Sequence, residues 1–210
     1  MATEHSADGR DRTIRAALEL LEESGLDALT LRAIGRRLDV RINTVSWHVK
    51  SKARLQDLMA DAILAEIDLT GLPDAWRERT VELAHRYRAA LLAHRDGARV
   101  VAGSFAAEPA TLAVAETLIA ALLEGALDPE PAAWTCWTII YFTLGLTQEE
   151  QAEPGALADR VESAITTRTY PALAKVLPHL AGGEFSTRFD YGLNLILTAA
   201  TPTHEGARTR

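Results

Sequence analysis

The chain of 210 residues contains a single cysteine, Cys136, so it cannot form an internal disulfide bond. A lone thiol suits a reducing compartment, and we expect the protein to be cytoplasmic. Residues 1–11 are polar and carry no apolar stretch of the kind that a secretory signal requires. The longest apolar run, at residues 139–146, is far too short for a transmembrane helix, so we expect no membrane partner.

The sequence also lacks the residue patterns of the common enzyme classes. It has no Cys–His metal cluster and no glycine-rich phosphate loop, and neither Ser104 nor Ser163 has the flanking glycines of a nucleophile elbow. Cys136 falls in an apolar helix, where a buried and unreactive thiol is expected. The pair Glu149-Glu150 is most simply a solvated helix end. We therefore predict no enzymatic activity, no metal site and no cofactor.

Charge is unevenly distributed along the chain, whose net charge is −7. Residues 30–54 hold seven basic residues and one acidic residue, so this segment carries +6. A compact basic segment in an acidic chain indicates a local polyanion-binding surface. Charge alone leaves a second interpretation equally open, which is a basic helix that is simply solvated.

Apolar residues recur at helical spacing through almost the whole chain, and no strand-like alternation persists. We expect an all-α protein with a domain at residues 1–52, a connecting helix at 53–70 and a larger domain at 71–203. The break at Thr70-Gly71-Leu72-Pro73 marks the boundary. The predicted helices span residues 10–23, 31–38, 42–48, 53–68, 74–93, 109–124, 130–150, 157–178 and 184–200, with a short one after Arg95.

Two of the predicted helices, 31–38 and 42–48, are short and are separated by a tight turn at Asp39 and Val40. Neither buries much surface alone, so apolar residues on both would hold the pair against the first helix. The second helix then points polar residues outward. This arrangement fits the major groove of DNA, with the N-terminal end of the second helix at the base edges.

Residues in and around these helices follow a known pattern. They are Ala16-Ala17-Leu18-Glu19-Leu20-Leu21, Gly25, Leu29-Thr30, Arg32, Leu38, Thr44-Val45 and Trp47-His48-Val49-Lys50-Ser51-Lys52. This set resembles the three-helix, helix-turn-helix DNA-binding domain of the tetracycline-repressor (TetR) family. Residues 88–92, 95–100 and 142–145 resemble the C-terminal regulatory domain of the tetracycline repressors themselves.

The resemblance implies a homodimeric regulator that binds a palindromic operator in double-stranded DNA and responds to a small-molecule inducer. It implies that Thr30, Trp47, His48 and Lys52 contact or orient phosphates, and that Arg32, Ile42, Asn43, Thr44 and Ser46 face bases. Arg41 is long enough to reach a base or a phosphate, and Lys50 completes the predicted DNA-binding set. Asp39 replaces the usual turn glycine, which the fold tolerates because aspartate accepts left-handed geometry. Ser46 stands where an aromatic is usual and Arg41-Ile42-Asn43 is unlike the tetracycline repressors, so we expect a different operator from theirs.

The sensing residues of the tetracycline repressors are only partly present. Val101 falls where the family has a histidine that ligates magnesium, and valine has no lone pair for a metal. Asp68 and Leu83 fall at positions that hold the drug and differ from the family, whereas Ser104 and Glu149 match it. One carboxylate without its imidazole partner is a poor magnesium site. We therefore predict an inducer other than tetracycline–magnesium.

Aromatic and apolar residues on two helices are further candidates for the wall of a ligand cavity. Besides the positions above they are Tyr87 and Leu91 on the helix after residue 74, Trp134, Trp137, Ile140, Tyr141 and Leu144 on the helix after residue 130, and Phe105 from a loop. Such a cavity suits a flat or largely apolar ligand. A stripe of this kind is more often plain core or dimer interface. For His85 and His94, surface or hydrogen-bonded roles are favoured over ligand contact.

The helices at 130–150 and 184–200 would form a four-helix dimer interface, because Phe185, Phe189, Leu193 and Ile196 share one stripe. A ligand would shift the helix that follows Lys52, change the spacing of the two DNA-binding heads and so lower DNA affinity. A sequestering protein with a vestigial DNA-binding head is the alternative, and the intact basic face argues against it. An enzyme built on a helical bundle has no supporting pattern.

Overall fold

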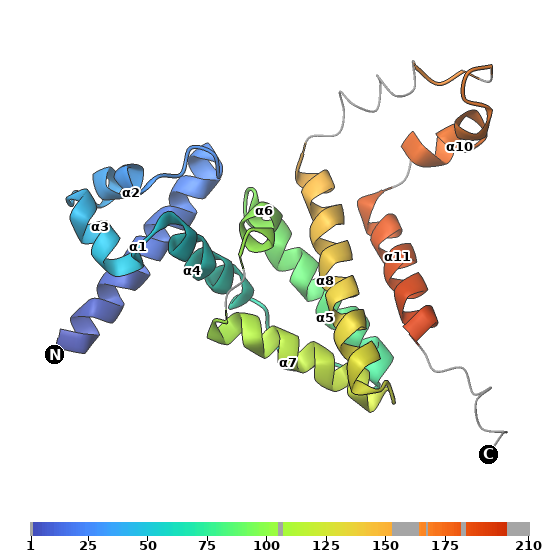
Figure 1. Ribbon diagram of the computed structural model, residues 1–210, viewed down its shortest axis with the longest axis horizontal. Coiled ribbons are helices and arrows are strands. Elements are labelled where there is room, and N and C mark those ends of the chain that lie inside the picture. The colour runs from blue at the N-terminus through green and yellow to red at the C-terminus, as the bar shows by residue number, and fades with distance from the viewer. Residues whose placement is uncertain (1, 105–106, 153–163, 167, 182–183, 201–210) are drawn as a thin grey trace.

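The computed structural model describes residues 2–104, 107–152, 164–166, 168–181 and 184–200. These residues form an elongated assembly of helices, with a small N-terminal head at one end and a larger helical core beside it (Figure 1). No strand occurs within the described ranges, in agreement with the all-α prediction. None of the described helices is long and apolar enough to cross a membrane.

The head consists of α1 (Ala2–Ser24), α2 (Leu31–Leu38) and α3 (Ile42–Val49), which pack against one another. Leu21, Ile34 and Val45 are fully buried at their contact. Helix α2 begins at Leu31 because the Thr30 hydroxyl accepts a hydrogen bond from the Ala33 N–H at 3.1 Å. It ends because Asp39 adopts a left-handed conformation, with φ of 53°, which aspartate tolerates better than most residues.

Helix α1 begins earlier than the predicted residue 10, at Ala2. Residues 2–9 carry no apolar periodicity, so the sequence pattern contained no sign of this extension. Gly9 lies within the helix, and the ring of His48 occupies the place where a side chain at residue 9 would begin: an added Cβ would lie 2.2 Å from His48 Cε1. The extension of α1 therefore rests against the end of α3.

Helix α4 (Lys52–Leu64) joins the head to the core. The Ser51 hydroxyl caps it by accepting a hydrogen bond from the Arg54 N–H at 3.0 Å. The helix stops at Leu64, four residues before the predicted end. Beyond it the Asp68 carboxylate accepts hydrogen bonds from the N–H and the hydroxyl of Thr70, at 2.8 and 2.7 Å. This local turn competes with continued helix.

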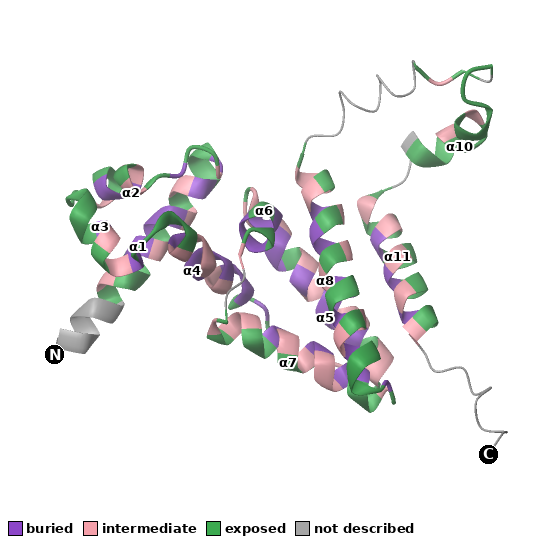
Figure 2. Cartoon of the chain, in the orientation of Figure 1, coloured by how far each residue is buried: buried purple, intermediate pink, exposed green. Residues whose placement is uncertain are grey.

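The core contains α5 (Trp76–Leu92), α6 (Gly97–Ala102), α7 (Pro109–Glu124), α8 (Pro129–Gln151) and α11 (Phe185–Ala200). Prolines at the first position fit the starts of α7 and α8, whereas α5 begins after Ala75 without the side-chain cap expected from Asp74. Figure 2 shows buried stripes on the sides of α4, α5 and α8 that face one another. Helix α10 (Pro171–Ala181) covers the end of the predicted helix 157–178, whose residues 157–163 lie outside the described ranges.

Two residues of the predicted stripe on α11 pack on the chain's own core and are therefore not available for a dimer interface, whereas Phe185 and Ile196 are half-buried. Phe189 and Leu193 are fully buried. The Phe189 ring stacks on Phe142 of α8, with ring centroids 5.7 Å apart. The opposite side of α11 instead leaves Tyr191 and Leu195 exposed.

Candidate functional site

The outer face of the head collects the residues predicted to bind DNA. Nine of the eleven lie in one short stretch, residues 41–52, on α3 and its flanking turns, whereas Thr30 caps α2 and Arg32 lies on it. The exposed members are Thr30, Arg32, Arg41, Ile42, Asn43, Thr44, Trp47, Lys50 and Lys52, and the half-buried members are Ser46 and His48. Val45 and Val49 point inward and are fully buried. Helix α3 is therefore held by one apolar face and presents the other to solvent.

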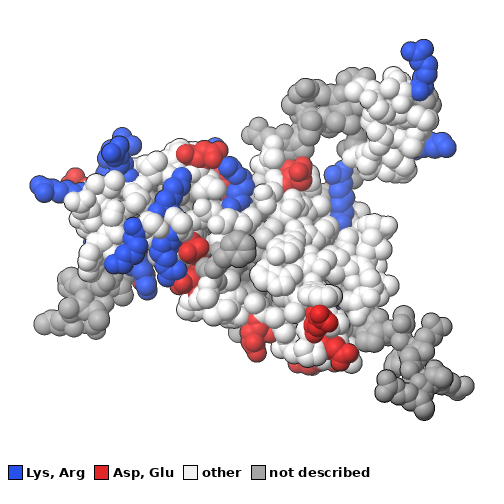
Figure 3. All heavy atoms as spheres, in the orientation of Figure 1, with Lys and Arg blue, Asp and Glu red and all other residues white. Residues whose placement is uncertain are grey.

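The basic side chains of this face differ in whether they have acidic partners. Within the described ranges no carboxylate pairs with Arg32, Arg41, Lys50 or Lys52. Arg37 in contrast binds Glu19 and Glu23 of α1, each at 2.8 Å, which raises the pKa of its guanidinium. Figure 3 shows Lys and Arg side chains gathered over the head. The unpaired cations can thus be neutralised by an external polyanion.

His48 has a defined orientation at the edge of this surface. Its ring lies against Gly9 of α1 and meets the Trp47 ring edge to face, with centroids 4.9 Å apart. Its Nδ1 is buried and has no hydrogen-bond partner in the described part of the chain. Packing alone therefore sets the position of this imidazole.

A cavity of about 300 Å³ lies in the core between α4, α5, α7 and α8. Five of the predicted ligand-binding residues line it: Tyr87, Val101, Ser104, Trp137 and Tyr141. Ile140 and Leu144 of the same predicted stripe also line it. The remaining wall consists of Leu64, Ala102, Ala107, Thr111, Leu112, Val114 and Ala115. Sequence reasoning missed these, since an amphipathic pattern does not show which turn of α4 or α7 borders a cavity.

The other predicted ligand-binding residues lie elsewhere. Leu83 and Leu91 are fully buried in the core, and Asp68 and Glu149 are exposed. Trp134 lies in a separate groove of about 830 Å³ between α8 and α11, beside Leu195 and Ile196. Phe105 falls outside the described residues.

Three side chains judged from sequence are clarified by their contacts. Cys136 is buried, and burial raises the pKa of its thiol to about 11, which confirms an unreactive cysteine. His85 lies 3.0 Å from Asp190, a polar role of the expected kind. The prediction of a solvated Glu149-Glu150 end is wrong for Glu150, which is half-buried and pairs with Arg88 of α5.

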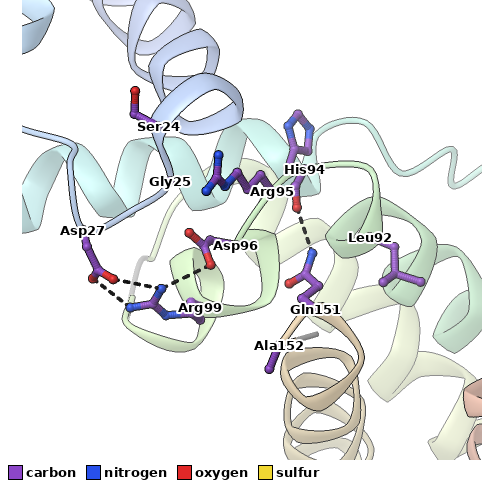
Figure 4. Close-up of a pocket in the computed structure, with 10 residues that line it drawn as sticks. All are labelled: Ser24, Gly25, Asp27, Leu92, His94, Arg95, Asp96, Arg99, Gln151 and Ala152. Atoms are coloured by element: carbon purple, nitrogen blue, oxygen red, sulfur yellow. Dashed lines mark hydrogen bonds and ion pairs between the residues drawn. The ribbon is translucent and has the colours of Figure 1, made fainter. Parts of the chain in front are cut away.

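The contact between the head and the core is polar, and we call it the head–core junction (Figure 4). It borders a groove of about 530 Å³ between the loop after α1 and the turn before α6. Asp96 accepts a hydrogen bond from the Leu26 N–H at 2.8 Å, and Arg99 bridges Asp27 at 2.9 Å and Asp96 at 3.1 Å. Burial alone would raise the pKa of Asp96, but the hydrogen bonds from Leu26 and Arg99 outweigh it and hold this pKa below its ordinary value.

His94 and Gln151 extend the junction to α4 and α8. The two ring nitrogens of His94 lie 3.1 Å from Glu22 of the head and from Glu66 just beyond α4, the hydrogen-bonded role that the sequence favoured. Gln151, at the end of α8, donates hydrogen bonds to the Leu91 and His94 carbonyls at 3.0 and 2.8 Å. The turn between α5 and α6 is therefore fixed to the head, to α4 and to α8 at once.

Comparisons with known proteins agree with this architecture. The model of bacterial regulatory proteins of the tetR family matches residues 14–57, and the model of the tetracyclin repressor-like C-terminal domain matches residues 70–199. The tetracycline repressor protein class A from transposon 1721 of Escherichia coli is 35% identical over 187 residues, which cover 88% of this chain and 86% of that protein.

Solved structures from Streptomyces coelicolor share the fold. A possible TetR family transcriptional regulator has a TM-score of 0.83 and 39% identity, and the match covers 90% of this chain and 97% of that one. The TetR family protein ActR in complex with actinorhodin has a TM-score of 0.83 and 26% identity, over 91% and 95% of the two chains. The chain therefore belongs to the TetR family of bacterial transcriptional regulators, and it is a DNA-binding, ligand-responsive regulator with a tetracycline repressor-like C-terminal domain.

Proposed function

We propose that this protein is a dimeric repressor that binds a palindromic operator through α3 and releases it when a small molecule enters the core cavity. The observation that carries the proposal is the course of α4. This helix begins at Lys52, on the basic face of the head, and ends at Leu64, on the cavity wall. One helix thus contacts both sites, so a displacement of either end of α4 also changes the position of its other end.

The DNA-binding role is assigned to residues 1–52. Lys50, Lys52, Thr30, Trp47 and His48 would contact or orient phosphates and thereby set affinity and its salt dependence. The side chains that would face bases are Arg32, Arg41, Ile42, Asn43, Thr44 and Ser46. In this assignment residues 53–70 connect the head to a sensing and dimerisation domain at 71–203.

Contacts from α4 to α6 and α7 support transmission from the cavity. Gln56 donates a hydrogen bond to the Val100 carbonyl at 3.0 Å, and Arg54 pairs with Glu108 just before α7. Asp61 accepts hydrogen bonds from the N–H and hydroxyl of Thr111, at 2.8 and 3.1 Å. Thr111 itself lines the cavity. A ligand that displaces α6 or the start of α7 would therefore move α4, and linkage would lower the affinity for DNA.

The inducer proposed here is not a tetracycline–magnesium chelate. Val101 occupies the cavity wall, and no described residue of that wall carries an imidazole or a carboxylate. A magnesium ion needs oxygen ligands, usually including carboxylates, and this wall offers none. The same wall lacks paired acid and base groups, which supports a sensing role without catalysis. A regulator that acts at chromosomal DNA would work in the bacterial cytoplasm.

Dimerisation would involve the exposed faces of α8 and α11. Trp134, Tyr191 and Leu195 are large residues with roughly half or more of their surface exposed. A second copy that covers them would place two α3 helices at one palindromic site, one helical turn or about 34–36 Å apart. The alternative of a sequestering protein with a vestigial head is not favoured, because the cations that flank α3 have no carboxylate partner among the described residues.

Selection of random duplex DNA by the purified full-length protein at fixed salt is the test. A palindromic consensus is expected, and its affinity should fall when the same selected duplex is titrated with Lys52→Ala or His48→Ala. Lys175→Ala on α10 is the matched control and should bind like the wild type. Equal binding of random and selected duplexes by a folded dimer would overturn the proposal.

A further inference from the structure

The cavity wall has no charged side chain among its described residues. Its polar groups are the side chains of Tyr87, Ser104 and Thr111, and the polar edges of Trp137 and Tyr141. A charged ligand would lose its hydration in such a cavity without gaining an opposite charge, which is strongly unfavourable. The wall therefore selects against ions.

Two of these polar groups already have partners within the protein. The Ser104 hydroxyl donates to the Val101 carbonyl at 2.9 Å. The Thr111 hydroxyl donates to Asp61 at 3.1 Å. Neither has its proton free for a ligand.

Tyr87 differs from both. It projects from α5, is only 6% exposed and lines the cavity. No described residue accepts a hydrogen bond from its hydroxyl. Burial, with a smaller contribution from Cys136, raises the pKa of this phenol, so the group keeps its proton and can act as a donor. Because this donor has no partner among the described residues and borders the cavity, an acceptor inside the cavity could satisfy it.

Two aromatic side chains of α8 also border the cavity. The rings of Trp137 and Tyr141 are stacked, with centroids 5.3 Å apart and planes 23° from parallel. Both line the cavity. Aromatic rings held in this way favour a planar partner that stacks on them.

We propose that the ligand of this cavity is an uncharged planar aromatic molecule with a carbonyl oxygen that accepts a hydrogen bond from the Tyr87 hydroxyl. The inference rests on the proposed function, in which this cavity is the sensing site. The rings of Trp137 and Tyr141 favour a planar ligand, and the absence of charged groups on the wall favours a neutral one. The Tyr87 hydroxyl favours a ligand with a hydrogen-bond acceptor.

Three matched planar probes separate the requirement for an acceptor from the requirement for neutrality: 9-fluorenone, fluorene, which lacks the oxygen, and 9-fluorenone-4-carboxylate, which adds a charge. Binding of each to the full-length protein is measured by equilibrium dialysis, for the wild type and for Tyr87→Phe. The preference for fluorenone over fluorene should fall about fivefold in Tyr87→Phe, the effect of one net hydrogen bond. Fluorene should bind both proteins equally, which shows that the variant cavity is intact.

Tyr170→Phe removes a hydroxyl from an exposed tyrosine just before α10 and should leave the preference unchanged. Equal preference in the wild type and Tyr87→Phe overturns the assignment of Tyr87, and tighter binding of the carboxylate than of fluorenone overturns the neutral ligand class. If none of the probes binds while the selected operator is still bound, the ligand class fails and the DNA-binding function stands. If fluorenone binds through Tyr87 without releasing the operator, the ligand class stands and the proposed sensing function fails.

Discussion

The face of α3 and the core cavity are the two proposed sites of this molecule, and they are built from opposite kinds of residues. The face of α3 carries cations whose charge no described carboxylate neutralises, and it is open to solvent. The cavity is lined by apolar and aromatic side chains, with no charged group among its described residues. At the head–core junction, Glu22 of the head instead pairs with His94, and Asp27 of the head and Asp96 just before α6 pair with Arg99.

Because the two sites differ in charge, different physical forces should control binding at each of them. Binding through the α3 face depends on charge and should weaken steeply with salt, because counterions are released from DNA. Binding in the cavity depends on apolar burial and one hydrogen bond, so salt should affect it little. A regulator of this construction can change its DNA affinity without placing charge at its sensing site.

The largest expected effect comes from removing the free cations of the head. The double variant Lys50→Ala/Lys52→Ala removes two charges from each half-site, so operator affinity should fall about 100-fold, or about 3 kcal/mol. The slope of log affinity against log salt should become shallower by about four for the dimer. Fluorescence anisotropy of the selected operator at several salt concentrations measures both.

The same experiment tests the contrast with the cavity. Dialysis of 9-fluorenone against the double variant should give the wild-type affinity at every salt concentration. Lys175→Ala should leave both measurements unchanged. A salt slope that does not change would show that Lys50 and Lys52 do not lie at phosphates.

The head was predictable from sequence to a greater depth than the cavity. The predicted ranges 31–38 and 109–124 agree with α2 and α7, because local signals act there: Thr30 caps α2, Asp39 ends it and Pro109 starts α7. Most residues predicted to face DNA came from one continuous stretch around α3. The start of α1 was missed because residues 2–9 have no apolar periodicity.

The cavity required packing information that a local pattern does not contain. Trp134 and Trp137 are three residues apart on α8, yet they border different spaces, since α11 lies beside one and α7 near the other. Asp68 was expected to contact a ligand. Helix α4 ends at Leu64, however, and Asp68 lies beyond it in an exposed turn with Thr70. Residues such as Leu112 became cavity wall only through the placement of α7 against α4 and α8.

An intermediate effect is expected at the head–core junction, where the half-buried Asp96 carboxylate accepts a hydrogen bond from the head. Because the pKa of Asp96 in the fold lies below its ordinary value, the ionised form stabilises the native state above about pH 4. This contribution, about 1 kcal/mol, is lost as the pH falls through the native pKa. Asp96→Ala should therefore lower the free energy of unfolding at pH 7 and reduce its decline between pH 5 and 3, in urea titrations.

Asp74→Ala is the control for this measurement, because Asp74 is exposed and its carboxylate makes no described hydrogen bond. It should keep the wild-type pH profile. A profile for Asp96→Ala that parallels the wild type from pH 7 to 3 would show that the Leu26 and Arg99 contacts do not set the carboxylate's pKa.

A smaller effect is expected for Gly9→Ala, which should raise thermal stability but lower operator affinity. An alanine there favours the helix by up to about 1 kcal/mol, so thermal stability should rise. Its Cβ would lie 2.2 Å from His48 Cε1, however, so the imidazole must move. Operator affinity should fall by a few-fold, or about 1 kcal/mol. Adding Gly9→Ala to His48→Ala should cost no further affinity, and an additive loss would contradict the role of Gly9 in positioning His48.

For tetracycline with magnesium we expect no effect on DNA binding. Addition of tetracycline with magnesium should leave the operator complex intact in anisotropy, because the wall position held by Val101 provides no metal ligand. Val101→His alone should not restore sensing, since the wall would still lack a carboxylate within its described residues. Release of the operator by tetracycline–magnesium, but not by tetracycline with a chelator, would mean that the uncharged cavity accepts a metal after all. The contrast between the charged face of α3 and the uncharged core cavity would then be wrong.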